Sequence, residues 1–264
     1  MKTISLTLLA TGIAAYSLCA QNILINFGSG TGNSPRVYTG TNSPGHNAGE
    51  LSGTNWINLF QDTASGIEDE FGNATNLAID FGTTTTDTGT TLNYSAATKS
   101  ANYSVESAVD QDLKNLFDTN LGEGNAVRDG SGSPGIGLSI SGLDAGEYRF
   151  YVTSFRGDTE ANARTDFDIY AGSSNDAITD FSDYSVGTIF NSTTVSGWSY
   201  GDNYLSGTFT IDGTNDTFSL LSNSNSYIGV LTSLEIVSVP EPGTYAAMIG
   251  GIALLLVATR RRRA

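Results

Sequence analysis

Short apolar segments of strand length repeat along the chain between residues 22 and 237, and this pattern limits the fold more than any other feature. The segments are rich in β-branched and aromatic residues, and they cover residues 23–27, 77–81, 136–140, 148–155, 167–170, 205–211, 218–221 and 228–237. Turn-forming Gly, Asn, Asp and Thr separate them, which is typical of strands. Where apolar and polar residues alternate, one face of the strand is buried and the other is wet. We therefore predict an all-β fold, a single β-sandwich over residues 21–238.

One candidate hairpin spans residues 208–220. Its two strands alternate apolar and polar residues, and its five-residue loop opens with Asp212-Gly213, a frequent turn pair. The Thr-rich segment 83–91 predicts an exposed loop.

Helical patterns are scarce, and we expect one or two short helices. Residues 110–117 place Leu113, Leu116 and Phe117 on one side at helical spacing. Residues 56–60 fit either a short helix or a strand. The sandwich therefore dominates the predicted fold.

The central part of the chain is strongly acidic. Residues 21–240 hold 26 Asp and Glu against seven Lys and Arg, a net charge of −19. Such a surface repels phosphate backbones, so we expect no nucleic-acid partner. Cations and neutral glycans remain candidate ligands.

Cysteine and histidine are nearly absent. Cys19, the only cysteine, lies in the N-terminal segment, so the mature chain should have no disulfide, no Cys-ligated zinc and no thiol catalysis. His46 is the only histidine, in a segment that predicts a solvated loop. A Ser-His-Asp triad would have to use His46 as its base.

The N-terminal segment predicts export. Lys2 precedes an apolar run over residues 4–18, which is too short to span a membrane, and small residues precede the bond between Ala20 and Gln21. We predict a signal peptide over residues 1–20, handled by the Sec translocon and signal peptidase. A lipoprotein site at Cys19 is the weaker alternative, because bulky Leu18 fits that pattern badly.

The C-terminal segment, residues 239–264, has three parts in order. They are a Pro-Glu-Pro motif, an uncharged apolar run that predicts a transmembrane helix over about residues 243–259, and an arginine cluster. The motif is Pro240, Glu241 and Pro242, and the cluster is Arg260, Arg261, Arg262 and Arg263. As a helix the 15 residues 245–259 rise about 22 Å, short against a core of about 30 Å. The arginines should stay on the cytoplasmic side, which leaves the acidic domain outside. A plain tail anchor is the alternative.

This tail resembles the PEP-CTERM sorting signal of Gram-negative bacteria. In that family an exosortase, a membrane protease-transpeptidase, recognises the Pro-Glu-Pro motif, and the protein proceeds to the cell surface or the extracellular matrix. The resemblance implies that residues 240–242 are the recognition site and that the membrane anchor is transient.

Two central segments resemble galactose-binding-like jelly rolls. They are the turn and strand at residues 140–150, with Gly142-Leu143 leading to Gly146 and Tyr148, and the closing strand at residues 227–236. The resemblance covers about residues 138–237 and implies a jelly-roll-like sandwich. Fibronectin-like sandwiches use a similar entry to a strand.

Aromatic side chains in loop-like settings are candidates for stacking on a sugar. They are Trp56, Trp198, Tyr200 and Tyr204, and Arg156 could supply hydrogen bonds. The alternative is that the tryptophans are ordinary packing residues.

Several acidic groups could supply the oxygen ligands that Ca²⁺ requires. The candidates are Asp166 with Asp168, Asp212 with Asp216, and the cluster at residues 68–70. None matches an EF-hand loop, and solvated turn residues are the alternative for each. We expect no catalytic metal or other cofactor.

These features predict a non-enzymatic protein of the cell surface or extracellular matrix, associated with exopolysaccharide or biofilm. A carbohydrate-binding module with a specific glycan ligand is the alternative. A glycan-active enzyme is third, because its carboxylate pair is defined by spacing in three dimensions, which no sequence motif supplies here.

Overall fold

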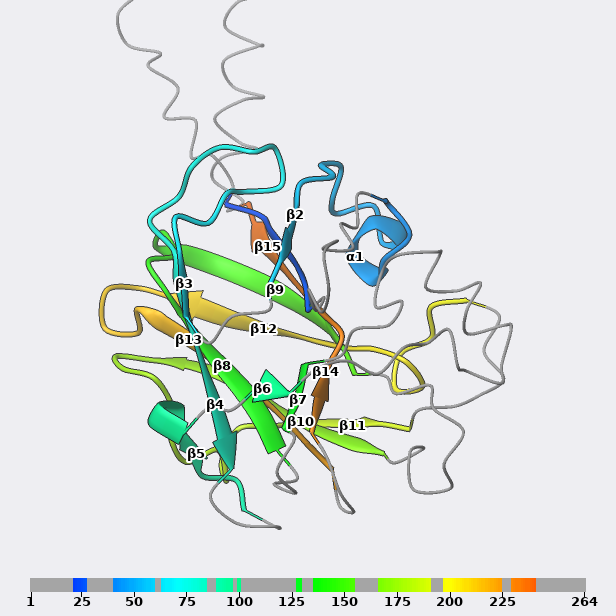
Figure 1. Cartoon of the computed structure of the whole chain (residues 1–264). Coiled ribbons are helices and arrows are strands. Elements are labelled where there is room, and N and C mark those ends of the chain that lie inside the picture. Colours follow the sequence, from blue (N-terminus) through cyan, green and yellow to red (C-terminus); the bar gives the residue numbers. More distant parts are fainter. Residues whose placement is uncertain are drawn as a thin grey trace, which may run out of the picture.

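The computed structural model describes residues 21–27, 40–59, 63–84, 89–96, 99–100, 127–129, 135–154, 166–190, 197–224 and 229–240. Within these ranges the protein is a sandwich of two β-sheets, which confirms the predicted all-β class (Figure 1). The predicted signal peptide, the sorting tail beyond Pro240, the helix at residues 110–117 and Arg156 lie outside the described residues. Among the residues that are described, no helix has the length and apolar character needed to cross a membrane.

Sheet A brings the two ends of the domain together. In spatial order it contains β12 (Leu205–Ile211), β9 (Gly146–Thr153), β15 (Ser233–Val239), β1 (Ile23–Asn26) and β2 (Trp56–Asn58). All neighbours are antiparallel except β1 and β2, which run parallel. The first and last strands of the described domain are therefore adjacent, and the two chain ends leave sheet A on the same side.

Sheet B forms the second layer. In spatial order it contains β11 (Ser185–Ile189), β10 (Phe167–Ser174), β13 (Thr217–Ser224), β8 (Gly135–Ser141), β4 (Ala78–Thr84) and β3 (Thr63–Ser65), and β5 (Leu92–Asn93) also pairs with β4. A small third sheet contains β14 (Val230–Leu231), β7 (Val127–Asp129) and β6 (Lys99–Ser100). The described helices are α1 (Pro44–Asn47) and the 3-10 turn η1 (Tyr94–Ala96).

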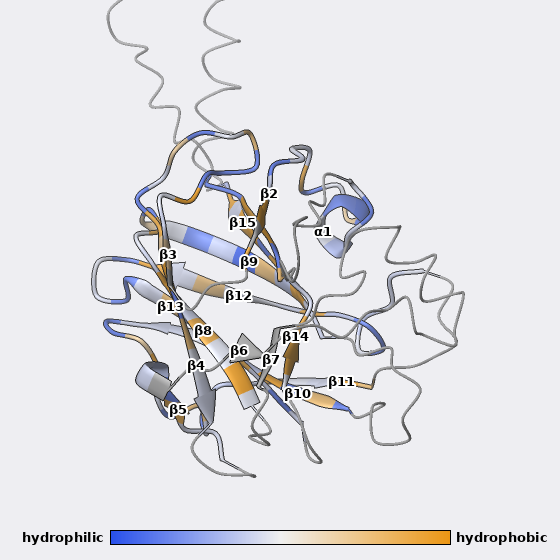
Figure 2. Ribbon diagram, viewed as in Figure 1, coloured by the Kyte–Doolittle hydropathy of each residue, from blue (hydrophilic) through white to orange (hydrophobic). Residues whose placement is uncertain are grey.

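The core lies between the sheets and is aromatic at its centre. Phe150 and Phe209 come from sheet A, and Phe218 comes from sheet B. The rings of Phe209 and Phe218 stack with centroids 4.2 Å apart. Figure 2 shows hydrophobic residues concentrated on the strands, while α1 and the loops are mainly hydrophilic. The alternation in the sequence therefore places one face of each strand in this core.

The predicted hairpin over residues 208–220 is wrong in its pairing. Both strands exist, but β12 pairs with β9 in sheet A, while β13 pairs with β8 and β10 in sheet B. The loop between them crosses from one sheet to the other. Because both strands send their apolar residues into the same core, the alternation is identical for a hairpin and for such a crossing.

One ambiguous segment is a strand, and one predicted loop begins inside a strand. Trp56 begins strand β2, so the alternative of a short helix is excluded there. Thr83 and Thr84 are buried at the end of β4, so the predicted exposed loop over residues 83–91 is wrong at its start. The predicted strand at residues 228–237 is divided between β14 and β15.

Candidate functional site

The outer face of sheet A carries a row of side chains that is aligned across four strands. Tyr151 on β9 is in register with Glu235 on β15, which is in register with Leu24 on β1, and Leu24 is in register with Trp56 on β2. Residues 40–53, which include α1 and are called the covering loop below, pack on this row through Leu51. The outer face of sheet A is thus partly closed by a segment that comes from between β1 and β2.

Glu235 is fully buried beneath the covering loop. Its Oε2 accepts a hydrogen bond from the Gly45 amide at 2.6 Å, and its Oε1 has no partner among the described residues. A Cβ atom at Gly45 would lie 2.2 Å from Oε2, so only glycine allows this approach. Burial raises the pKa of Glu235 to about 8, although the Ser43 hydroxyl and the Gly45 amide oppose that rise. At neutral pH this side chain is therefore mostly a neutral carboxylic acid.

His46 holds the covering loop together. Its Nε2 lies 2.8 Å from the Gly53 carbonyl oxygen, and its Nδ1 lies 2.7 Å from the Ser43 hydroxyl. Since a carbonyl only accepts, Nε2 must carry a proton. The imidazole also stacks on Trp56 with centroids 6.1 Å apart. The predicted solvated loop histidine is therefore wrong, and the Ser43 hydroxyl that faces its Nδ1 is buried.

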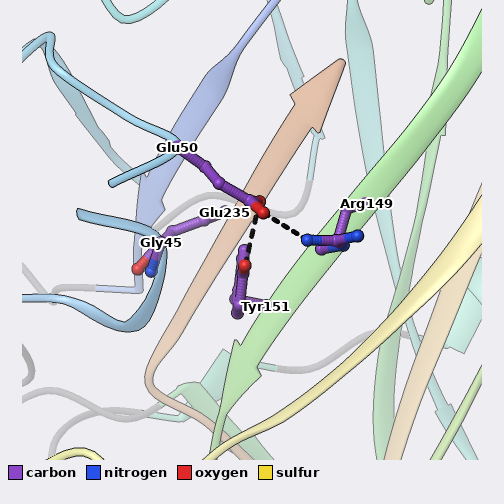
Figure 3. Close-up of polar contacts among 5 residues, drawn as sticks. All are labelled: Gly45, Glu50, Arg149, Tyr151 and Glu235. Atoms are coloured by element: carbon purple, nitrogen blue, oxygen red, sulfur yellow. Dashed lines mark hydrogen bonds and ion pairs between the residues drawn. The ribbon is translucent and has the colours of Figure 1, made fainter. Parts of the chain in front are cut away.

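A polar triplet at the edge of the covering loop ties it to β9. Figure 3 shows Glu50 reaching both Arg149 and Tyr151. Glu50 forms an ion pair with Arg149, and the Tyr151 hydroxyl donates to its other oxygen at 2.9 Å. Burial, followed by the hydrogen bond to Glu50, raises the pKa of Tyr151 to about 12. Tyr151 therefore stays a neutral hydrogen-bond donor throughout the physiological pH range.

Residues 197–204, called the aromatic loop below, gather three of the predicted aromatic side chains. The ring of Tyr204 lies 6.5 Å from Trp198, 5.9 Å from Tyr200 and 6.0 Å from Tyr151. The Trp198 indole donates to Asn42 Oδ1 at 3.0 Å, which links the aromatic loop to the covering loop. Tyr200 is 59% exposed and carries the ring most open to solvent in this group.

Hydrogen bonds fix the shape of the aromatic loop. Asn203 is buried, and its side chain accepts from the Ser199 amide at 3.0 Å and donates to the Gly197 carbonyl at 2.9 Å. The Gly201 amide donates to the Tyr204 carbonyl, and Gly201 has a positive φ of 85°. Only glycine adopts that conformation readily, so the turn beside Tyr200 depends on it. Tyr200 is thus presented on a pre-ordered loop.

The remaining residues predicted for glycan binding have other positions. Trp56 is 5% exposed, and its indole donates to the Gly40 carbonyl, so its ring packs under the covering loop.

Two exposed aromatic side chains, Phe71 and Phe190, were not predicted from the sequence, because nothing in their local patterns separates an exposed ring from a buried one. The Phe190 amide donates to the Gly201 carbonyl, which places its backbone beside the aromatic loop.

Of the two candidate Asp pairs for Ca²⁺, Asp166 with Asp168 and Asp212 with Asp216, three residues accept hydrogen bonds within the protein. Asp168 accepts from the Thr188 hydroxyl, Asp212 from two amides of its own turn, and Asp216 from the Thr217 hydroxyl. The three carboxylates of the cluster at residues 68–70 likewise accept hydrogen bonds from backbone or side-chain amides of nearby residues. Within the described ranges, no three His, Cys, Asp or Glu side chains are grouped so that they could hold a metal ion.

No protein-family model matches the chain, and no curated protein matches it. Among solved structures, the CBM22-1 and GH10 modules of a Clostridium thermocellum endo-1,4-β-D-xylanase in complex with xylohexaose are 16% identical, with a TM-score of 0.26 over 45% of this chain and 22% of that one. A family GH115 4-O-methyl-α-glucuronidase with specificity for decorated arabinogalactans is 10% identical, with a TM-score of 0.28 over 55% and 18%. A cleaved adhesin domain of the Lys-gingipain of Porphyromonas gingivalis is 12% identical, with a TM-score of 0.28 over 53% and 100%.

The chain matches about a fifth of the length of the first two proteins and the whole of the third. TM-scores this low assign neither a family nor a function.

Proposed function

We propose that this protein is an exported, non-enzymatic surface protein whose β-sandwich binds a neutral glycan through the aromatic loop. The observation that carries the binding part is Tyr200, an exposed ring held on a hydrogen-bonded turn beside Trp198 and Tyr204. The electron-rich face of such a ring attracts the weakly positive C–H groups of a sugar. Because the loop is already ordered, little conformational entropy is lost when a ligand binds.

The charge of the domain supports a neutral ligand. The net charge of −19 over residues 21–240 disfavours uronic acids, sulfated sugars and nucleic acids. Arg149, on the strand β9 that contacts the aromatic loop through Tyr151, is already paired with Glu50. Hydrogen-bonding groups beside the rings include Ser199 and Asp202, which bond each other at 2.6 Å.

The interior carboxylates support a binding role over catalysis. Glu235 is covered by the loop that contains Gly45. The Glu70 carboxylate accepts hydrogen bonds from the backbone amides of Ser52 and Gly53, which hold that loop in place. An acid pair for glycoside hydrolysis would need both groups to flank a substrate.

The delivery part of the proposal rests on the terminal sequences. The predicted signal peptide at residues 1–20 and the PEP-CTERM resemblance at residues 239–264 suggest export, a transient inner-membrane anchor, and release to the cell surface by an exosortase. The resemblance of residues 138–237 to galactose-binding-like jelly rolls fits a glycan-rich destination such as exopolysaccharide or biofilm.

Glycan-array binding followed by titration tests the binding role. Tyr200→Ala should lower the affinity for a bound neutral glycan by about tenfold or more, because it removes a stacking surface worth at least about 1.4 kcal/mol. Tyr200→Phe is the matched control, since it keeps the ring. Absence of binding to every glycan, or equal binding by Tyr200→Ala, would contradict the proposal.

Fractionation of cells tests the delivery role separately. Alanine at Pro240, Glu241 and Pro242 should leave the protein unprocessed in the membrane fraction. Normal processing and surface delivery of that variant would show that an exosortase does not read this motif.

A further inference from the structure

Phe71 is the most exposed large hydrophobic side chain among the described residues, at 63%. It lies at the tip of a tight turn, residues 69–73, in the connection between β3 and β4. A single exposed hydrophobic residue on a protein surface needs no explanation. Here, however, the ring forms one wall of a depression whose other walls are also fixed.

The turn that presents Phe71 is held by the buried carboxylate of Asp69. One oxygen accepts the amides of Phe71 and Asn73, both at 2.9 Å, and the other accepts the Asn73 side chain at 2.8 Å. Burial alone would raise the pKa of Asp69, but these hydrogen bonds outweigh it and hold the pKa below its usual value. Gly72 has a φ of 82°, which permits the sharp reversal. The backbone position of Phe71 is therefore set by the turn.

The opposite wall is attached to the same turn through Glu70. Its carboxylate is buried and accepts the amides of Ser52 at 3.1 Å and Gly53 at 2.6 Å. The Asn55 amide donates to the Glu70 carbonyl at 3.1 Å, and the Asn55 side chain donates to the Asp69 carbonyl at 2.9 Å. The two walls therefore form one rigid unit.

Between these walls lies an open depression of about 400 Å³, lined by Ser52, Gly53, Thr54, Asn55, Glu70 and Phe71. Its volume falls within the range of small-molecule sites. The lining combines one aromatic ring with hydroxyl, amide and backbone groups and the buried acidic residue Glu70, and it contains no basic residue. This chemistry suits a neutral, hydroxyl-rich ring and disfavours an anion.

The depression is separate from the aromatic loop. Asn22 links Glu70 to the chain ends, because its side chain donates to Glu70 at 2.7 Å and accepts the Ser238 amide at 2.9 Å. In Figure 1 the β3–β4 connection lies at the upper left, beside the ends of the domain, whereas the segment leading into β12 lies at the right. A ligand in the depression would leave the aromatic loop open.

We propose that this depression is a second carbohydrate site, which takes a single neutral pyranose residue with its apolar face on Phe71. It extends the proposed function by making the domain bivalent for neutral glycans. A bivalent domain can link two chains, or bind one chain with higher avidity.

Amide NMR shifts of the full chain, in a detergent without sugar head groups, test the second site. The probes are the methyl glycosides of glucose, galactose, mannose and xylose, each added up to a few tens of millimolar, since single-sugar sites are weak. We expect shifts at residues 52–55 and 69–73. They should disappear in Phe71→Ala, and they should persist in Phe71→Tyr and in Tyr200→Ala.

The possible outcomes separate the two sites. Shifts confined to the aromatic loop would overturn the second site and leave the first intact, whereas shifts confined to residues 52–55 and 69–73 would do the reverse. Shifts that persist in Phe71→Ala, or no shift with any probe, would also overturn the second site. An unchanged unfolding temperature of Phe71→Ala would show that loss of the shifts is not loss of folding.

Discussion

Replacing Glu235 by glutamine should remove a large part of the pH dependence of stability between pH 4.5 and pH 8. The carboxyl group lies fully buried under the covering loop, with one oxygen on the Gly45 amide. Glutamine has the same shape and keeps a carbonyl oxygen that can accept this hydrogen bond. It has no charge to lose or gain, so the comparison isolates the cost of ionising a buried acid.

The sign of the effect follows from the two pKa values of Glu235. The pKa is about 8 in the folded protein, against 4.5 for a glutamate side chain exposed to water in the unfolded chain. Below pH 4.5 both states are protonated, and the full stability is present. As the pH rises, the unfolded chain ionises first, so stability falls until the pH reaches about 8 and then levels off. At about 1.36 kcal/mol per pH unit, the total loss is about 5 kcal/mol.

Urea unfolding of both proteins at several pH values from 4 to 9 measures this loss. Trp56 lies under the same loop, so tryptophan fluorescence follows the relevant region. Glu235→Gln should be close to wild type near pH 4.5 and more stable than wild type by several kcal/mol above pH 8. Asp212→Asn, in an exposed turn, is the control and should leave the slope between pH 5 and 8 unchanged. Parallel curves for wild type and Glu235→Gln would refute the assignment of a neutral buried acid.

Three further changes test the packing described above. Gly45→Ala should cost about 1–3 kcal/mol in urea unfolding, because the new Cβ would lie 2.2 Å from the buried carboxylate, whereas Gly197→Ala, with no atom within 4 Å, should be nearly neutral. Asp69→Ala should destabilise the protein by about 1–3 kcal/mol, because the turn amides lose their acceptor. This destabilisation should shrink as the pH falls through the lowered pKa of Asp69, and urea unfolding of both proteins near pH 3 and near pH 6 would detect the difference. Phe218→Ala should cost about 3–5 kcal/mol and lower the thermal midpoint, since the ring is fully buried against Phe209; a loss below 1 kcal/mol would contradict the core as described.

The sequence predicts the strands far better than it predicts their partners. The apolar runs centred on residues such as Ile25, Leu138 or Ile236 are strands. A strand with one buried face shows alternating apolar and polar residues, and this pattern can be recognised in the local sequence. Whether two consecutive strands pair with each other depends on which of the two sheets each strand joins, and the local alternation does not show that. This is why the loop between β12 and β13 could be mistaken for a hairpin turn.

The candidate sites divide in the same way. Trp198, Tyr200 and Tyr204 are close in sequence, so their grouping could be predicted, and the structure brings them together. The local pattern places Glu235 on the wet face of its strand, and it is buried only because Gly45, 190 positions earlier, packs on it. Phe71 follows three acidic residues, Glu68 to Glu70, which is typical of a solvated turn. No local pattern shows either environment.

The adjacency of β1 and β15 affects how the domain can fold during its synthesis. β15 lies between β1 and β9, so sheet A remains two separate pieces until Val239 is available. Contacts between the first and last strands have nearly the largest sequence separation the domain allows, and such contacts form slowly. The emerging chain should therefore stay incomplete, with an open central gap in sheet A, until its last strand has been made. Completion of the fold must therefore wait until synthesis has nearly reached the C-terminal segment.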